Sequence, residues 1–239
     1  MKLLGNSAKQ LVKTMLVFGF MLAMGVTPLF AQPIHTGTLA NLANGGTLSI
    51  DDKTFSGFSY QNSGLTSFDP TAITVTASES GGIDYLTWSG NISFVSGGIA
   101  TADLALNYIV TANPGSINMI DQSYTGVATN GLLAIDETVA TGAFGGTVVG
   151  YSHLEIGDNN DPPGEPVQGD NLVINPSQSV LYVTKDIGLA VISSSGGSVT
   201  IDQVEQSFHQ VPEPTTVGCF LLGLGALVCC QRFTKNRLS

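Results

Sequence analysis

The sequence predicts an all-β fold, an antiparallel β-sandwich with a jelly roll as the candidate topology. Turn-forming residues recur at intervals of about 15 to 19 residues along the middle of the chain. The stretches between them are rich in Val, Ile, Thr, Tyr and Phe, which suit half-buried pleated strands. No central stretch keeps the 3.6-residue apolar spacing of an amphipathic helix. The turn signals lie at positions 44–46, 64, 81–82, 97–98, 113–115, 130–131 and 145–146.

Apolar and polar side chains alternate within the expected strands. The alternation is clearest in residues 103–110, and it recurs in 73–77 and 181–183. Because successive side chains of a strand point to opposite faces, one set should face the core. For the first stretch that set is Leu104, Leu106, Tyr108 and Val110.

The N-terminus has the pattern of a secretory signal peptide. Lys2, Lys9 and Lys13 precede an uncharged apolar run over 15–26, and the small residue Ala31 suits the position before the cut. We expect residues 1–31 to be removed. The alternative is an uncleaved anchor helix, for which the apolar run is short.

The predicted exported part is strongly acidic. All 18 acidic residues of the chain lie between Asp51 and Glu213, and only Lys53 and Lys185 among the basic residues lie there, which gives a net charge of −16. Such a charge keeps a protein soluble and repels nucleic acid, so nucleic-acid binding is excluded as a function. Charged partners should be cationic.

Cysteine is confined to the C-terminal tail, at Cys219, Cys229 and Cys230. The exported part therefore has no disulfide, although secreted proteins meet oxidising conditions. Its stability must come from a hydrophobic core. Residues 32–210 are long enough for one such domain.

One acidic, proline-dense segment, 158–166, is predicted to be an exposed loop. It supplies the oxygen ligands that Ca²⁺ prefers. The alternative is a solvated loop whose charge serves solubility. The candidate ligands are Asp158, Asn160, Asp161 and Glu165.

No catalytic residue is predicted. The sequence has no Gly-x-Ser-x-Gly and no His-Glu-x-x-His motif, and His35, His153 and His209 lie far apart. His153 is expected to be a half-exposed residue of a strand over 148–156. Asp136 and Glu137 are adjacent and should point to opposite faces, as solubilising charges at a strand end and not as a glycosidase pair.

Aromatic residues raise sugar binding as an alternative. Trp88 shares a strand face with Leu86 and is expected in the core, whereas Tyr85 should lie on the opposite face. Candidate surface platforms are Tyr60, Tyr85, Tyr124 and Tyr151.

The C-terminus, residues 211–239, has three parts in order. Pro212, Glu213 and Pro214 come first, an apolar run over 217–230 follows, and a basic tail ends the chain. The span 215–233 has 19 residues, or about 28 Å as a helix, close to the thickness of a bilayer core. The basic tail predicts a cytoplasmic C-terminus. The proposed membrane residues are Val217, Leu221, Leu222, Leu224, Leu227 and Val228, with Arg232 reaching the headgroups.

This three-part tail behind a signal peptide resembles the PEP-CTERM sorting signal of bacterial exported proteins. The resemblance implies that residues 212–214 are recognised by an exosortase-like membrane enzyme. It also implies that the apolar run holds the protein in the inner membrane until processing. The destination would be the cell envelope, the cell surface or an extracellular matrix that contains exopolysaccharide.

The sequence therefore predicts an exported structural or interaction protein without catalytic activity and without a cofactor other than Ca²⁺. The alternative function is a carbohydrate-binding module that acts on exopolysaccharide. A hydrolase is a more distant alternative.

Overall fold

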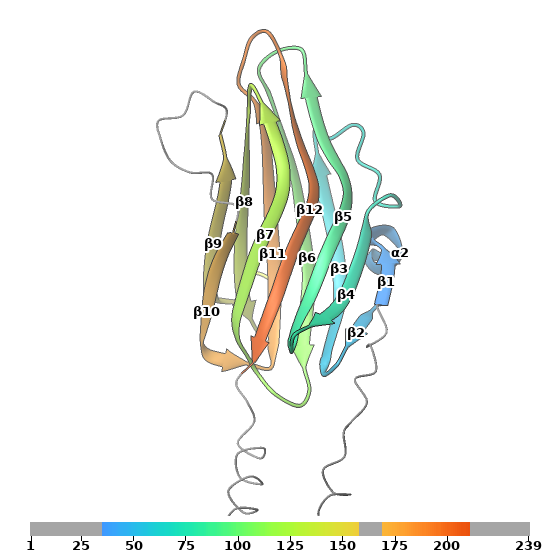
Figure 1. Cartoon of the computed structure of the whole chain (residues 1–239), viewed down its shortest axis with the longest axis vertical. Coiled ribbons are helices and arrows are strands. Elements are labelled where there is room, and N and C mark those ends of the chain that lie inside the picture. The colour runs from blue at the N-terminus through green and yellow to red at the C-terminus, as the bar shows by residue number, and fades with distance from the viewer. Residues whose placement is uncertain (1–34, 158–168, 211–239) are drawn as a thin grey trace, which may run out of the picture. The chain divides into compact units, whose positions relative to one another are not determined.

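The structure is a computed structural model that describes residues 35–157 and 169–210 (Figure 1). These residues form twelve strands, one short helix and two six-stranded sheets in which every pair of neighbours is antiparallel. The predicted β-sandwich is confirmed.

Sheet A has the strand order β1-β4-β5-β12-β7-β10. Its central strands are long, and β12 has a neighbour on each side for most of its length. Its strands are β1 (His35–Thr38), β4 (Thr74–Ser80), β5 (Ile83–Ser96), β12 (Gly197–Gln210), β7 (Ile117–Thr129) and β10 (Gly169–Gln178).

Sheet B has the order β2-β3-β6-β11-β8-β9 and packs face to face against sheet A. Strand β11 lies at its centre between β6 and β8. Its strands are β2 (Leu48–Ile50), β3 (Lys53–Ser63), β6 (Ala100–Ala112), β11 (Val180–Val191), β8 (Gly131–Thr141) and β9 (Thr147–Ile156).

The last eight strands pair in a nested series. Strand β5 pairs with β12, β6 with β11, β7 with β10, and β8 with β9. Successive pairs alternate between the sheets, so this part of the chain is one long hairpin wrapped around a common core. That arrangement is a jelly roll.

The predicted turns fall between strands. Gly81 and Gly82 join β4 to β5 with positive φ of 64° and 81°, and Asn130, with φ of 52°, joins β7 to β8. Glycine and asparagine tolerate this left-handed region better than other residues, so they fix where these strands end. The helix α2 (Leu39–Ala43) was not predicted, because five residues are too few to show a helical period.

The core is centred on an aromatic cluster between the sheets. Tyr108 of β6 has its ring centroid 5.3 Å from that of Trp88 and 6.1 to 6.5 Å from those of Phe55, Phe58 and Phe208. All five side chains are buried. Such contacts add to the burial of a large apolar area. The predicted inward face of residues 103–110 is confirmed, because Leu104, Leu106, Tyr108 and Val110 are all buried.

Both lysines of the described residues are inside the sandwich. Lys53 is 2% exposed and Lys185 is fully buried. Since residues 35–157 and 169–210 contain no arginine, the charged side chains on their surface are acidic apart from histidine. The predicted signal peptide and C-terminal membrane segment lie outside this region. Within it, no helix has the length and apolar character needed to cross a membrane.

Candidate functional site

The predicted sorting and calcium-binding residues cannot be placed. The sorting motif Pro212–Glu213–Pro214, the apolar tail and the acidic loop with Asp158, Asn160, Asp161 and Glu165 all lie outside the described residues. In the two segments that the structure does describe, no group of three or more His, Cys, Asp or Glu side chains is placed to hold a metal ion. These assignments stay predictions.

The strongest candidate site is a shallow hollow of about 270 Å³ on the outer face of sheet A. A row of side chains crosses four neighbouring strands there: Tyr85 of β5, Ser207 of β12, Asp121 of β7 and Asn171 of β10. Beside it runs a second row with Thr87, Glu205, Ser123 and Gly169. The hollow is lined mostly by polar side chains with one aromatic ring.

Strand alternation explains how the hollow arises. In β5, Asp84, Leu86 and Trp88 face the core, and Tyr85 therefore faces outward. Three small residues lie in these rows: Ser207 of β12 in the first, and Ser123 of β7 and Gly169 of β10 side by side in the second. The outer face of the sheet is therefore recessed at these small residues, and larger polar side chains border the recess.

Asp121, Ser207 and His209 contact one another within sheet A, but they do not form a catalytic triad. Asp121 Oδ2 lies 2.7 Å and Ser207 Oγ 3.2 Å from the same nitrogen, Nε2 of His209. A triad needs the acid on one ring nitrogen and the hydroxyl on the other. The Ser207 hydroxyl also lies 3.2 Å from Asp121 Oδ2, so this cluster orients Asp121 at the hollow.

The outer face of sheet B carries a second group of acidic residues. Asp136 of β8 accepts hydrogen bonds from the Tyr151 hydroxyl and, at 2.7 Å, from Nδ1 of His153, both on β9. The hydrogen bond to Asp136 raises the pKa of His153. The predicted half-exposed position of His153 in a strand is confirmed, since its side chain is 43% exposed.

Asp103 and Asp186 form a carboxyl pair on this face. The hydrogen bond between them, together with partial burial and the charges of Asp103 and Asp136, raises the pKa of Asp186 to about 6. Two carboxyl groups in direct contact are closer than the roughly 5 to 9.5 Å that glycosidase pairs need. A hollow of about 440 Å³ lies beside Asp103, but its lining is mostly small apolar residues and includes no aromatic ring.

The variant Asp186→Asn is expected to stabilise the protein at pH 8 and to have little effect at pH 4. The native state binds the Asp186 proton more tightly than the unfolded state, so its contribution to stability falls as pH rises between about 4 and 6. Because Asp186 is exposed, solvent screening reduces the gain to about 1 kcal/mol. Thermal unfolding of the full chain at both pH values checks this. The variant Asp202→Asn, at an exposed aspartate of β12, is the control, and equal gains at pH 4 and pH 8 would contradict the prediction.

The aromatic residues considered for sugar binding differ in their exposure. Trp88 is 2% exposed and belongs to the core, as predicted. Tyr85 is half-buried beside the hollow, and Tyr151 is 58% exposed on sheet B. Tyr60 packs edge to face against Phe68. Tyr124 was wrongly proposed as a surface platform: it is 6% exposed, because its position in β7 follows the core-facing Ile120 and Gln122 at a spacing of two.

The expectation that Glu137 is a solubilising surface charge is also wrong. Glu137 points to the face opposite Asp136, as alternation requires, but that face is the core, where Glu137 is fully buried. Its carboxylate accepts hydrogen bonds from Lys185 Nζ and, at 2.7 and 2.8 Å, from Nε2 of Gln206. The paired charge explains how an acid can occupy this position.

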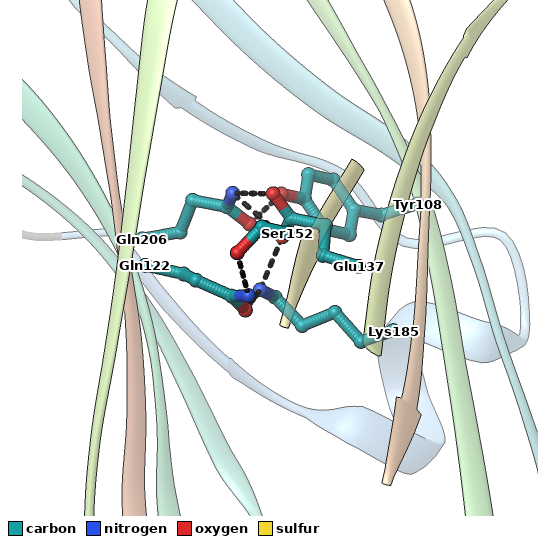
Figure 2. A network of polar contacts seen from close by, with 6 residues as sticks. All are labelled: Tyr108, Gln122, Glu137, Ser152, Lys185 and Gln206. Carbon is teal, nitrogen blue, oxygen red and sulfur yellow. Dashed lines mark hydrogen bonds and ion pairs between the residues drawn. The ribbon is translucent and has the colours of Figure 1, made fainter. Parts of the chain in front are cut away.

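Glu137 belongs to a polar network that links the two sheets (Figure 2). Lys185 Nζ donates to Gln122 Oε1 at 2.8 Å, and Gln122 Nε2 lies 2.5 Å from Ser152 Oγ. Tyr108 donates its hydroxyl proton to Gln206 Oε1. Gln122 and Gln206 come from sheet A and the other members from sheet B, as Figure 2 shows. The buried members are Tyr108, Gln122, Glu137, Ser152, Lys185 and Gln206.

A sequence signal for this network exists in the alternation itself. Lys185 lies between Val183 and Ile187 in the apolar register of its strand, and Glu137 lies between Ile135 and Val139. Gln206 likewise lies between Val204 and Phe208. A polar residue at an apolar position of a strand must find a buried partner, so these positions could have been singled out.

No protein-family profile matches the chain, and no curated protein matches its sequence. Among solved structures, TmCBM61 in complex with β-1,4-galactotriose is similar at 12% identity and a TM-score of 0.30, over 63% of this chain and 88% of that one. A family two carbohydrate esterase from Cellvibrio japonicus is similar at 11% identity and a TM-score of 0.28, over 77% and 36% of the two chains. A DUF4465 family protein from Bacteroides caccae has 8% identity and a TM-score of 0.25, over 56% and 86%. Similarities of this size assign no activity to the chain.

Proposed function

We propose that this chain is an exported, non-catalytic interaction protein whose β-domain binds polysaccharide in the hollow of sheet A. The observation that supports the proposal is the row of side chains across β5, β12, β7 and β10. It places an aromatic ring, a carboxylate, a hydroxyl and a carboxamide on the outer face of one sheet.

These groups match the chemistry of a sugar. The apolar face of a sugar ring packs on an aromatic side chain, and its hydroxyls exchange hydrogen bonds with Asp121 Oδ2, the oxygens of Glu205 and the amide of Asn171. Asp121, Asp170 and Glu205 also make the hollow acidic. The ligand should therefore be a neutral or amine-bearing polysaccharide, since an anionic one would be repelled.

Affinity electrophoresis tests the proposal. In gels that contain a soluble neutral glucan or a soluble chitosan, we expect the purified protein to be retarded by at least one of the two. The variants Tyr85→Ala and Asp121→Asn should weaken the interaction by about tenfold or more, the effect of losing a central aromatic or hydrogen-bonding contact.

The control is Tyr151→Ala, which removes an exposed tyrosine from the opposite sheet and should leave retardation unchanged. Equal behaviour of the Tyr85 and Tyr151 variants would show that the hollow is not the binding site. The absence of retardation by both polysaccharides would oppose the proposal as a whole.

The destination is proposed separately, from the two ends of the sequence. We propose that the protein is exported, held briefly in the inner membrane, and released to the envelope or matrix by an exosortase-like enzyme that recognises Pro212–Glu213–Pro214. Replacement of these three residues by alanine should remove the protein from the surface fraction. Cell fractionation, with the mature C-terminus identified by mass spectrometry, checks this, and unchanged surface display would contradict it.

A further inference from the structure

The buried network also holds the groups needed to form a covalent bond. A primary amine, a carboxamide and a carboxyl group meet at Lys185 Nζ, where Gln122 Oε1 lies 2.8 Å away and the Glu137 carboxylate is in direct contact. Lys185 and Glu137 are fully buried, and Gln122 is 3% exposed. Amine and carboxamide come from opposite sheets, Lys185 from β11 and Gln122 from β7.

We propose that Lys185 and Gln122 form an intramolecular amide bond that ties sheet B to sheet A, with Glu137 as the proton carrier. The new bond joins Lys185 Nζ to Gln122 Cδ. The structure holds Lys185 Nζ against the carboxamide of Gln122, 2.8 Å from its Oε1 (Figure 2).

The surroundings prepare the amine for attack. Burial disfavours the ammonium form and lowers the pKa of Lys185, although the Glu137 carboxylate opposes this effect. The proposed reaction uses the uncharged amine, which forms when one proton passes from Lys185 to the Glu137 carboxylate in contact with it. The fixed contact with the carboxamide replaces a collision between two molecules.

The atoms of the reaction balance without an oxidant or a reductant. The amine lone pair adds to Gln122 Cδ, and the Nζ–Cδ bond forms. Glu137 then gives its proton to Nε2 of Gln122. The Cδ–Nε2 bond of Gln122 breaks, and ammonia leaves. The Glu137 carboxylate then takes the extra proton from Nζ, which regenerates the acid and leaves a secondary amide. Ser152 Oγ, 2.5 Å from Nε2, is placed to contact the leaving nitrogen.

Lys53 provides a contrast within the same domain. Its Nζ lies 2.5 Å from Asp84 Oδ2 and 3.1 Å from Asp52 Oδ1, so two carboxyl groups and no carboxamide surround it. Neither of these two partners has an amide nitrogen that can leave as ammonia, which the proposed reaction requires. We therefore expect Lys53 to stay an ionic partner and Lys185 alone to react.

A cross-link would stabilise this cysteine-free domain in the way that a disulfide stabilises other exported domains. Gln122 and Lys185 are 63 residues apart in the chain. A bond between them restricts the unfolded chain in the same way as a disulfide that closes a long loop. Unlike a disulfide, an amide resists reducing agents.

The test is mass spectrometry of the purified protein after incubation at neutral pH, denaturation and digestion with chymotrypsin, which does not cut at lysine. We expect most of the Lys185 peptide to be joined to the Gln122 peptide, with a mass equal to their sum less one molecule of ammonia. After denaturation, an amine-reactive reagent should modify Lys53 and leave Lys185 unmodified.

Two variants separate the chemistry from the fold. Glu137→Gln keeps the shape of the side chain but cannot carry the proton, so the joined peptide should be lost and Lys185 should become modifiable. Gln122→Met keeps most of the side-chain volume but has no carboxamide, so it should give no joined peptide and should leave Lys185 modifiable. Separate Lys185 and Gln122 peptides in the wild-type protein, full modification of Lys185, or an undiminished link in a folded Glu137→Gln variant would each overturn the proposal. None of these readouts depends on polysaccharide binding.

Discussion

The variant Glu137→Ala is expected to lower the free energy of unfolding by about 3 to 5 kcal/mol, the usual effect of breaking a buried ion pair from one side. Because this variant would also be unable to form the proposed amide bond, the Lys185 amine would be free and fully buried without its carboxylate, and Gln206 would lose its acceptor. Urea denaturation followed by circular dichroism measures the change. The matched control is Asp136→Ala, because Asp136 lies on the solvent side of the same strand. This variant should lower the free energy of unfolding by at most about 1 kcal/mol.

A double variant distinguishes an unpaired charge from a simple loss of packing. Glu137→Leu combined with Lys185→Met removes both charges and keeps most of the volume. It should be more stable than either single variant by about 2 kcal/mol or more. The reason is that replacing both members of a buried ion pair by apolar residues destabilises a protein less than replacing one member and leaving the other charge unpaired. Additive losses from the two single changes would show that the pair is not the cause.

The variant Trp88→Ala should cost about 3 to 5 kcal/mol, because it empties a large volume next to Tyr108 in the aromatic cluster. For a domain of this size that corresponds to a fall of roughly 10 °C in Tm. Scanning calorimetry of the purified protein checks this prediction. Tyr85→Ala, three residues earlier on the outer face, is the control and should change Tm by only a few degrees. A similar fall in Tm for both variants would contradict the structure, in which Trp88 faces the core and Tyr85 faces outward.

Much of the fold could be predicted because its determinants are local. Alternation in residues 103–110 is visible within one strand, and turn residues such as Gly81, Gly82 and Asn130 mark strand ends by their backbone preferences. Local patterns do not tell which strands become neighbours. The nested pairing of β5 with β12 joins segments more than 100 residues apart, so the topology was only a candidate at the level of sequence.

The candidate sites were harder to predict for the same reason. Glu137 was correctly expected to face away from Asp136, but whether that face met solvent or core depended on the partner Lys185, 48 residues further along the chain. The hollow in sheet A takes Tyr85, Asp121, Asn171 and Ser207 from four strands, and no motif in the sequence brings them together. Tyr124 and Tyr85 look alike in sequence, and only burial separates them.

The position of β12 has a consequence for biosynthesis. The last strand of the described chain lies in the middle of sheet A, between β5 and β7, and not at an edge. A nascent chain that has not yet delivered residues 197–210 leaves a gap there, with the backbone groups of two long strands unpaired. Stable folding of sheet A must therefore wait until residues 197–210 have been synthesised and can pair with both neighbours.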